Sequence, residues 1–229
     1  MAELAALHAL DCSKTYDNIA ALHDVYLKVE RGELVALVGA NGAGKSTLLR
    51  IAAGLMEPTG GSMLIEGFPA GSLEARAAMS YIGDEPALYG DLSVNEHIEF
   101  TGRLHNLPGR PDSADELLDR FQLAGRADDL PAQFSRGLRQ KTSLILGLVR
   151  PFAVLALDEP FVGLDPTGQA ALSDLLCAAA EAGAAVIVAT HQLAFIERAT
   201  RCVMLRAGDV AYSGPADPGV IDRLLRDAE

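Results

Sequence analysis

Residues 39–47 read Gly39-Ala40-Asn41-Gly42-Ala43-Gly44-Lys45-Ser46-Thr47. This stretch fits the pattern G-x-x-x-x-G-K-[ST], whose glycines allow a tight loop with backbone N–H groups turned toward phosphate oxygens. In that pattern the lysine, here Lys45, reaches the β- and γ-phosphates, and the hydroxyl of Ser46 binds Mg²⁺. A glycine-rich turn without a ligand is the alternative. The chain has only four lysines in 229 residues, so an accidental match is rare.

The segments on either side of this phosphate loop have the pattern that it requires. Leu34–Val38 is a continuous apolar run, which predicts a strand buried on both faces, and Lys45–Ala53 predicts a helix. The positive end of that helix would then face the phosphates. Further apolar runs predict strands at Val154–Leu157 and Ala184–Ala189. Strands of this kind between helices indicate an α/β fold with a parallel sheet.

The middle of the chain differs from its two ends. An alternating pattern predicts a strand at Asp24–Glu30, whereas residues 86–150 have helical patterns and no strand pattern. The predicted helices beyond the first are Val94–Arg103, Ser113–Gln122, Leu138–Val149, Pro166–Ala182 and Val220–Arg226. We therefore expect a single domain, 1–229, in which a helical subdomain at 86–150 is inserted into a core formed by 1–85 and 151–229.

Two acids end one of the predicted strands. Val154–Leu157 is followed by Asp158 and Glu159. Parallel sheets bind ligands at the carboxyl ends of their strands, so Asp158 is placed to hold Mg²⁺. Glu159 would be the general base that polarises an attacking water. An acidic pair that merely faces solvent is the alternative, and the phosphate loop makes it the less favoured one.

Charge and hydropathy limit the kinds of partner that the chain can have. Its 31 acids and 19 bases give a net charge of −12, so we expect no nucleic-acid partner. The longest charge-free stretch, Ala182–Ile196, is shorter than the roughly 20 residues of a spanning helix. Glu3 stands where a signal peptide carries positive charge, so we expect no secretion signal. The three cysteines form no C-x-x-C pair and are expected to be reduced thiols.

Five further segments fall in the order found in ATP-binding cassette (ABC) ATPases, and the resemblance covers nearly the whole chain. The chain resembles that family in a signature-like helix start, a D-loop aspartate, a switch histidine, an adenine-stacking aromatic and a Q-loop. The signature-like helix start is Phe134-Ser135-Arg136-Gly137-Leu138-Arg139-Gln140-Lys141, and the D-loop aspartate is Asp165 in Gly163-Leu164-Asp165-Pro166. The switch histidine is His191, the adenine-stacking aromatic is Tyr16, and the Q-loop is Tyr81-Ile82-Gly83-Asp84-Glu85-Pro86. For Tyr16, a half-buried strand tyrosine is the alternative, and a lone histidine at a strand end, such as His191, is usually a structural residue.

The resemblance implies a P-loop NTPase (RecA-like) core, an N-terminal antiparallel β-subdomain and the inserted α-helical subdomain. It also implies an ATPase that uses ATP and Mg²⁺. The implied nucleotide contacts are Tyr16, Gly39, Asn41, Gly42, Ala43, Gly44, Lys45, Ser46, Thr47, Ser135 and Gly137. The implied catalytic residues are Glu159, His191 and Lys45, and the implied metal contacts are Ser46, Asp158 and Asp84.

Two departures from the family pattern matter. The usual signature is Leu-Ser-Gly-Gly-Gln, and the string here, Phe134-Ser135-Arg136-Gly137-Leu138, keeps the serine and the second glycine but has Arg136 at the first glycine. A basic residue there resembles the exporter-type branch, in which ATPase and membrane subunits are separate chains. Asp84 stands where the Q-loop carries glutamine. Either this carboxylate weakens hydrolysis or coupling, or it substitutes adequately for the amide.

The resemblance also implies partners. Each ATP would lie between Lys45 of one chain and Ser135 of a second ATPase subunit, identical or different. A membrane-spanning permease would dock on Pro86-Ala87-Leu88-Tyr89 and the helix that follows, which would hold the chain in the cytoplasm at the inner face of the cell membrane. The expected function is the ATPase subunit of a transporter. The alternative is a regulatory dimer clamp in which Asp84 makes turnover slow.

Overall fold

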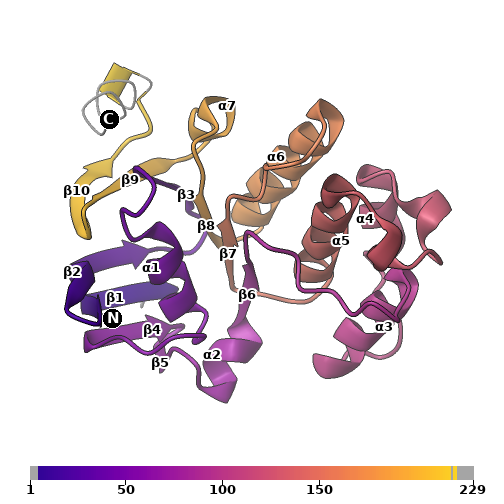
Figure 1. Ribbon diagram of the computed structural model, residues 1–229, viewed down its shortest axis with the longest axis horizontal. Coiled ribbons are helices and arrows are strands. Elements are labelled where there is room, and N and C mark those ends of the chain that lie inside the picture. Colours follow the sequence, from indigo (N-terminus) through magenta and orange to yellow (C-terminus); the bar gives the residue numbers. More distant parts are fainter. Residues whose placement is uncertain (1–4, 218, 221–229) are drawn as a thin grey trace. The chain divides into compact units, whose positions relative to one another are not determined.

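The computed structural model describes residues 5–217 and 219–220, and these form two compact units (Figure 1). The first unit contains the described residues up to Tyr81, those of Phe152–Glu159 and those from Leu176 onward. The second contains Ile82–Pro151 and Pro160–Leu175. The predicted helix at Val220–Arg226 lies outside the described residues except for Val220 itself.

The first unit begins with an antiparallel sheet whose strand order is β2-β1-β4-β5. Its strands are β1 Leu7–Tyr16, β2 Ile19–Val29, β4 Gly60–Ile65 and β5 Phe68–Pro69. In the second half of β2 buried residues alternate with exposed ones, which buries one face of that strand, whereas β1 follows this pattern only in part. The predicted strand Asp24–Glu30 is therefore the second half of β2.

The core sheet of the same unit has the strand order β10-β9-β3-β8-β7-β6. Its strands are β3 Leu34–Val38, β6 Met79–Ile82, β7 Val154–Asp158, β8 Ala185–Ala189, β9 Arg201–Arg206 and β10 Asp209–Gly214. The pairings β9–β3, β3–β8 and β8–β7 are parallel, and every residue of β3, β7 and β8 is buried. The continuous apolar runs thus predicted the centre of the sheet correctly, and the α/β class is confirmed.

Helices complete the first unit. They are α1 Lys45–Ala52, α2 Leu73–Ala78 and α7 Leu193–Ile196, while α6 Pro166–Glu181 has residues in both units. Leu48, Leu49 and Ile51 of α1 are buried in the same hydrophobic core as residues of both sheets. Helix α1 also contacts β4 and β7, so it packs against both sheets (Figure 1). The phosphate loop before α1 is therefore attached to a helix that is buried in the core of the unit.

The second unit is helical between β6 and β7. Its elements are α3 Val94–Leu104, α4 Ala114–Arg120, α5 Arg136–Leu148 and the 3₁₀ turns Ala124–Arg126 and Pro131–Gln133. Helix α5 packs against α3 and α4 (Figure 1). All residues from 86 to 150 are described, and none of them lies in a strand, as the sequence predicts. Within the described part of the chain, no helix is long and apolar enough to cross a membrane.

Candidate functional site

The phosphate loop connects the end of β3 to the first turn of α1. Gly44 precedes α1 with a φ of 105°, a region that disfavours side chains. A Cβ at this position would lie 2.6 Å from the carbonyl oxygen of Ala21 in β2. Both the backbone angle and the close strand require glycine here, so the packing of the unit maintains the loop's shape.

Lys45 turns back into the loop that precedes it. Its side chain is largely buried, with 8 % of the residue exposed, and its ammonium donates hydrogen bonds to the carbonyl oxygens of Gly39 (2.7 Å) and Ala40 (3.2 Å). A buried ammonium needs hydrogen-bond acceptors of this kind. The loop therefore positions a cation beside its own row of backbone N–H groups.

A cavity of about 330 Å³ lies in front of this loop. Its lining combines the loop, the start of α1, the end of β7 and one residue of β2. The lining residues are Ala21, Asn41, Gly42, Ala43, Gly44, Lys45, Ser46, Thr47, Asp158 and Glu159. The structure thus brings the two strand-end acids and the predicted loop residues other than Gly39 to one place. Ala21 was not predicted, because no pattern in the sequence marks its side of β2.

The strand-end acids have different surroundings. Asp158 ends β7 with 1 % of its surface exposed and lines the cavity. Glu159 has a left-handed backbone, with a φ of 45°, and its N–H donates to the carbonyl oxygen of Ala189 in β8 (2.8 Å). This turn ends the strand abruptly, and it places a buried and a partly exposed carboxylate at the same cavity.

His191, which follows β8, contacts Glu159 directly. Its Nδ1 lies 3.0 Å from Oε2 of Glu159. A carboxylate can only accept a hydrogen bond, so Nδ1 is the protonated nitrogen and donates. The imidazole is exposed, whereas the Glu159 side chain is mostly covered. Two residues predicted to be catalytic therefore form one hydrogen-bonded pair at the cavity's edge.

Tyr16 is not among the residues that line the cavity. It ends β1 and is partly exposed, and its hydroxyl contacts the sulfur of Met56 (2.8 Å). The ammonium of Lys14 lies 5.4 Å from the centre of its ring, within the range of a cation–π contact. The adenine-stacking role of Tyr16 stays a prediction.

The donor set at the cavity fits Mg²⁺. Ser46 and Asp158 offer a hydroxyl and a carboxylate, both hard oxygen ligands. The described residues contain no group of three or more His, Cys, Asp or Glu side chains that could hold a metal by themselves. Mg²⁺ is commonly bound through one or two protein ligands together with substrate phosphates, and this arrangement matches that use. Asp84 belongs to the second unit and follows β6, and its predicted metal role stays a prediction.

The signature-like segment begins α5 in the second unit. Ser135 is the N-cap residue, and its hydroxyl accepts a long hydrogen bond from the N–H of Leu138 (3.4 Å). A Cβ on Gly137 would overlap the carbonyl oxygen of Gly163, which precedes Asp165. The second glycine of the signature is thus required by close backbone packing within the unit. The nucleotide-contact roles of Ser135 and Gly137 remain predictions.

Lys141 is a functional candidate that the sequence analysis did not single out. It is buried in α5, and its ammonium lies 2.9 Å from the carboxylate of Asp165. The hydrogen bond from Lys141 is the main reason why the pKa of Asp165 lies below its usual value. The scarcity of lysine and the position of Lys141 one turn after Gly137 are signals that could have identified it.

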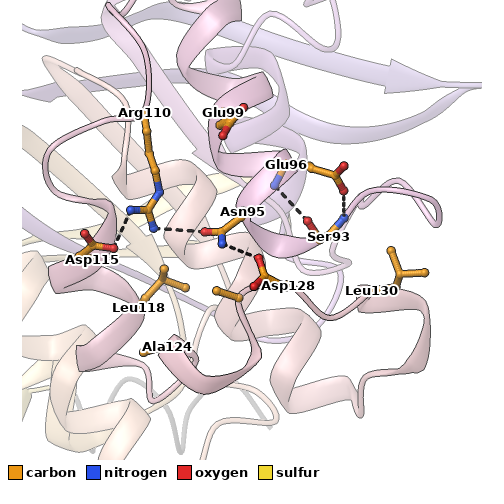
Figure 2. Close-up of a pocket in the computed structure, with 11 residues that line it drawn as sticks. Ser93, Asn95, Glu96, Glu99, Arg110, Asp115, Leu118, Ala124, Asp128 and Leu130 are labelled. Atoms are coloured by element: carbon orange, nitrogen blue, oxygen red, sulfur yellow. Dashed lines mark hydrogen bonds and ion pairs between the residues drawn. The ribbon is translucent and has the colours of Figure 1, made fainter.

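A larger cavity, of about 730 Å³, lies in the second unit among α3, α4 and the turns before α5 (Figure 2). Arg110 donates hydrogen bonds to Asp115 (2.6 Å) and Asn95 (3.2 Å), and Asn95 donates to Asp128 (2.8 Å). No phosphate-binding loop borders it, so its size does not make it the candidate active site.

Comparisons with known proteins identify the family of the chain. A family model described as ABC transporter matches residues 22–162. The SkfA peptide export ATP-binding protein SkfE of Bacillus subtilis is 38 % identical over 86 % of this chain and 83 % of its own length. The ABC-type transporter ATP-binding protein EcsA of the same organism is 34 % identical over 92 % of this chain and 87 % of its own length.

Solved structures agree as well. The structure of an ATP-binding subunit of an ABC transporter has a TM-score of 0.86 and 34 % identity, covering 98 % of this chain and 95 % of the other. The dimeric cassette MJ0796, in a post-hydrolysis state with ADP and Pi, has a TM-score of 0.85 and 26 % identity, covering 92 % and 99 %. The chain therefore belongs to the ABC transporter family, as an ATP-binding subunit that hydrolyses ATP to drive transport.

Proposed function

We propose that ATP is hydrolysed at the cavity formed by the phosphate loop, Asp158 and Glu159, in a dimer that energises a separate membrane permease. The observation that carries this proposal is the meeting of three chemical functions in one cavity. These are a cradle of backbone N–H groups with Lys45, a buried carboxylate, and a carboxylate paired with His191.

Each of these groups has a defined task. Lys45 and the loop N–H groups bind the β- and γ-phosphates, which removes much of the charge cost of binding. Glu159 accepts a proton from the attacking water, and the hydrogen bond from His191 orients its carboxylate. Ser46 and Asp158 would hold Mg²⁺. When it is bound, the ion neutralises and orients the phosphates.

A second chain completes the site in this proposal. Ser135 and Gly137 lie at the N-terminal end of α5, a helix of thirteen residues whose first N–H groups can bind an anion. Both belong to the second unit, together with Asp165. They would bind the nucleotide held by Lys45 of the other chain. The cassette MJ0796, to which this chain is similar, has been solved as a dimer, which supports a dimeric site.

The membrane partner is a permease that docks on Pro86–Tyr89 and α3, which holds the chain in the cytoplasm at the inner face of the membrane. Tyr89 and Phe100 are large apolar side chains exposed there. Arg136 favours the exporter-type branch, and one relative of this chain is named for peptide export. The transported molecule is not identified by these residues.

Asp84 favours one alternative, a dimer clamp that binds ATP and turns over slowly. Its carboxylate replaces the amide of the usual Q-loop glutamine and is exposed. An added negative charge would disfavour a triphosphate and its hydrolytic water. The output would then be the bound state of the dimer rather than a flux of substrate.

The proposal is tested by ATP binding and hydrolysis of the purified chain and two variants. We expect Glu159→Gln to bind a fluorescent ATP analogue like the wild type and to lose hydrolysis, because only the base is removed. We expect Lys45→Ala to lose both. Unchanged hydrolysis in Glu159→Gln would show that Glu159 is not the base. Measurable binding with slow wild-type turnover would favour the clamp.

A further inference from the structure

The loop between β6 and α3 is held by a buried histidine. His97 is the fourth residue of α3 and is 2 % exposed. Its Nε2 lies 2.9 Å from the backbone nitrogen of Tyr89, and its Nδ1 lies 2.8 Å from the carbonyl oxygen of Ser93. One side chain thus links two points of the loop to the helix.

The two contacts fix the state of the imidazole. A backbone N–H can only donate, so Nε2 accepts from Tyr89, and a carbonyl can only accept, so Nδ1 carries the proton. His97 is therefore neutral and has both ring nitrogens satisfied. A side chain without an acceptor at the Nε2 position would leave the N–H of Tyr89 without this partner, at a cost if that group stays buried.

The end of the loop is held independently. The hydroxyl of Ser93 accepts from the N–H of Glu96 (3.2 Å), and the N–H of Ser93 donates to the Glu96 carboxylate (2.7 Å), which forms a capping box (Figure 2). Bonds from Ser93 are the main reason why the pKa of Glu96 lies below its usual value. Tyr89 and Ser93 are thus both anchored to the same helix start.

These bonds give the ring of Tyr89 a fixed place on the surface. The ring lies 5.9 Å from the imidazole of His97 and meets Phe100 edge-on, with centroids 5.6 Å apart. Nevertheless, Tyr89 is 56 % exposed. An exposed aromatic ring that is already ordered loses little conformational freedom when a partner covers it. Such residues are typical anchors of protein interfaces.

The charges around this ring indicate the chemistry of the partner. Residues 84–99 contain five exposed acids and no lysine or arginine, and these acids are Asp84, Glu85, Asp91, Glu96 and Glu99. The neighbouring cavity of Figure 2 is lined by Glu96, Glu99, Asp115 and Asp128 against a single arginine, Arg110. A segment that covers Tyr89 and Phe100 is therefore favoured if it carries both apolar and basic side chains.

We propose that His97 is a positioning residue: it holds Tyr89 in place as the anchor for a basic segment of the membrane permease. This inference rests on the proposed function, because it takes the permease as the occupant of the surface formed by Tyr89 and Phe100. It adds the residue that orders this surface and the charge of the segment that covers it. His97 acts through Tyr89 and is not among the residues that line the nucleotide cavity.

The test measures binding of the full chain to liposomes that carry the membrane protein encoded next to its gene, with empty liposomes as the blank. Tyr89→Ala removes the anchor, and His97→Leu removes both imidazole bonds. His97→Gln restores an acceptor that can reach the N–H of Tyr89. Tyr26→Ala is the matched control, because Tyr26 is 54 % exposed in the other unit. ATPase activity without the membrane protein is measured for every variant.

We expect Tyr89→Ala and His97→Leu to bind at least about tenfold more weakly, as interface anchors do. His97→Gln should recover most of the affinity, and Tyr26→Ala should bind normally. Activity without the membrane protein should not change, and hydrogen exchange at the Tyr89 amide should be faster in His97→Leu. Normal binding by His97→Leu beside weak binding by Tyr89→Ala would overturn the role of His97. Normal binding by both variants would show that the surface formed by Tyr89 and Phe100 is not the docking surface. If the wild type does not bind, the membrane protein is not the partner of this chain.

Discussion

Nδ1 of His191 lies 3.0 Å from Oε2 of Glu159, so the candidate base and the candidate switch residue are hydrogen-bonded to one another. The donor is the imidazole, and its N–H orients one oxygen of the carboxylate. The pair resembles other base–orienter pairs of enzymes, in which a second residue fixes the direction of the group that takes the proton.

Replacing His191 by alanine should therefore slow hydrolysis more than it weakens binding. We expect His191→Ala to lower kcat about 100-fold, at the lower end of general-base effects, with the affinity for ATP changed less than about threefold. His23→Ala is a matched control, because His23 makes a comparable contact with Asp209 (3.1 Å) away from the cavity. Equal losses of binding and turnover would mean that His191 acts mainly as a nucleotide contact.

Asp165→Asn should destabilise the protein more than Lys141→Met does. The asparagine variant leaves a buried ammonium without its carboxylate, whereas the methionine variant leaves a carboxylate that is half exposed and can be hydrated. We expect losses of about 2 kcal/mol and about 1 kcal/mol, below the cost of breaking a fully buried pair. Chemical denaturation of both variants measures the difference, and the reverse order would contradict this description of the pair.

The same pair predicts a pH dependence. Since Lys141 lowers the folded-state pKa of Asp165, the contribution of this carboxylate to stability is complete above the unfolded-state value of about 3.9. It is lost as the pH falls through the lowered folded-state pKa. Asp165→Asn should therefore flatten the acidic limb of the stability profile below roughly pH 4. An unchanged acidic limb, measured by denaturation between acidic and neutral pH, would contradict the prediction.

Gly137→Ala should disturb the second unit, although alanine is a good helix former. The added methyl would overlap the carbonyl oxygen of Gly163, so either α5 or the segment before Asp165 must shift. We expect a loss of about 1–3 kcal/mol and slower hydrolysis. Gly125→Ala adds the same methyl group where no atom lies within 4 Å, and it should be neutral. Thermal unfolding and ATPase rates distinguish the two variants.

The charge beside the surface formed by Tyr89 and Phe100 can be reversed without replacing either aromatic residue. Glu99→Lys should weaken binding to the membrane protein several-fold and reduce the salt dependence of that binding, because a basic partner loses an attraction. Glu181→Lys makes the same change at the exposed end of α6 and should bind normally. Tighter binding by Glu99→Lys would show that the partner segment is acidic.

The sequence predicted the part of the fold in which local pattern and buried position coincide. Leu34–Val38, Val154–Leu157 and Ala184–Ala189 are buried on both faces, so their composition alone marks them as strands. Strand β1 was not predicted. It has several register shifts and a residue, Asp11, with a φ of 47°, which interrupt the alternation expected of a half-buried strand.

In the candidate site, too, some features could be predicted from the sequence and others could not. The residues of the phosphate loop are contiguous in the sequence, as are Asp158 and Glu159, so their roles could be predicted from spacing and from the end of a strand. Other interactions depend on contacts between separate elements or on the path of a loop. Examples are the ion pair of Lys141 with Asp165 and the hydrogen bond between His97 and the backbone of Tyr89. A single sequence contains no local signal for contacts of that kind. Asp84 is the converse case, because the sequence shows the substitution but not its effect.

Asp84→Gln measures that effect. If the carboxylate weakens hydrolysis, the variant should hydrolyse ATP faster than the wild type and respond differently to Mg²⁺ concentration, since the metal contact predicted for Asp84 would become neutral. ATPase rates across a Mg²⁺ titration provide the comparison. Identical curves would mean that Asp84 substitutes adequately for the usual glutamine, and the slow-clamp alternative would lose its support.

The central claim is that two chains share each ATP site, and mixing two inactive variants tests it most directly. Lys45→Ala lacks the phosphate-binding lysine, and Ser135→Arg blocks the helix start that would face the nucleotide of the partner. In a twofold-symmetric dimer of one variant with the other, one of the two sites has both residues intact. We expect each variant alone to be inactive and an equal mixture to recover up to about a quarter of the wild-type rate. A mixture as silent as its components, with both variants folded, would contradict a site shared between chains.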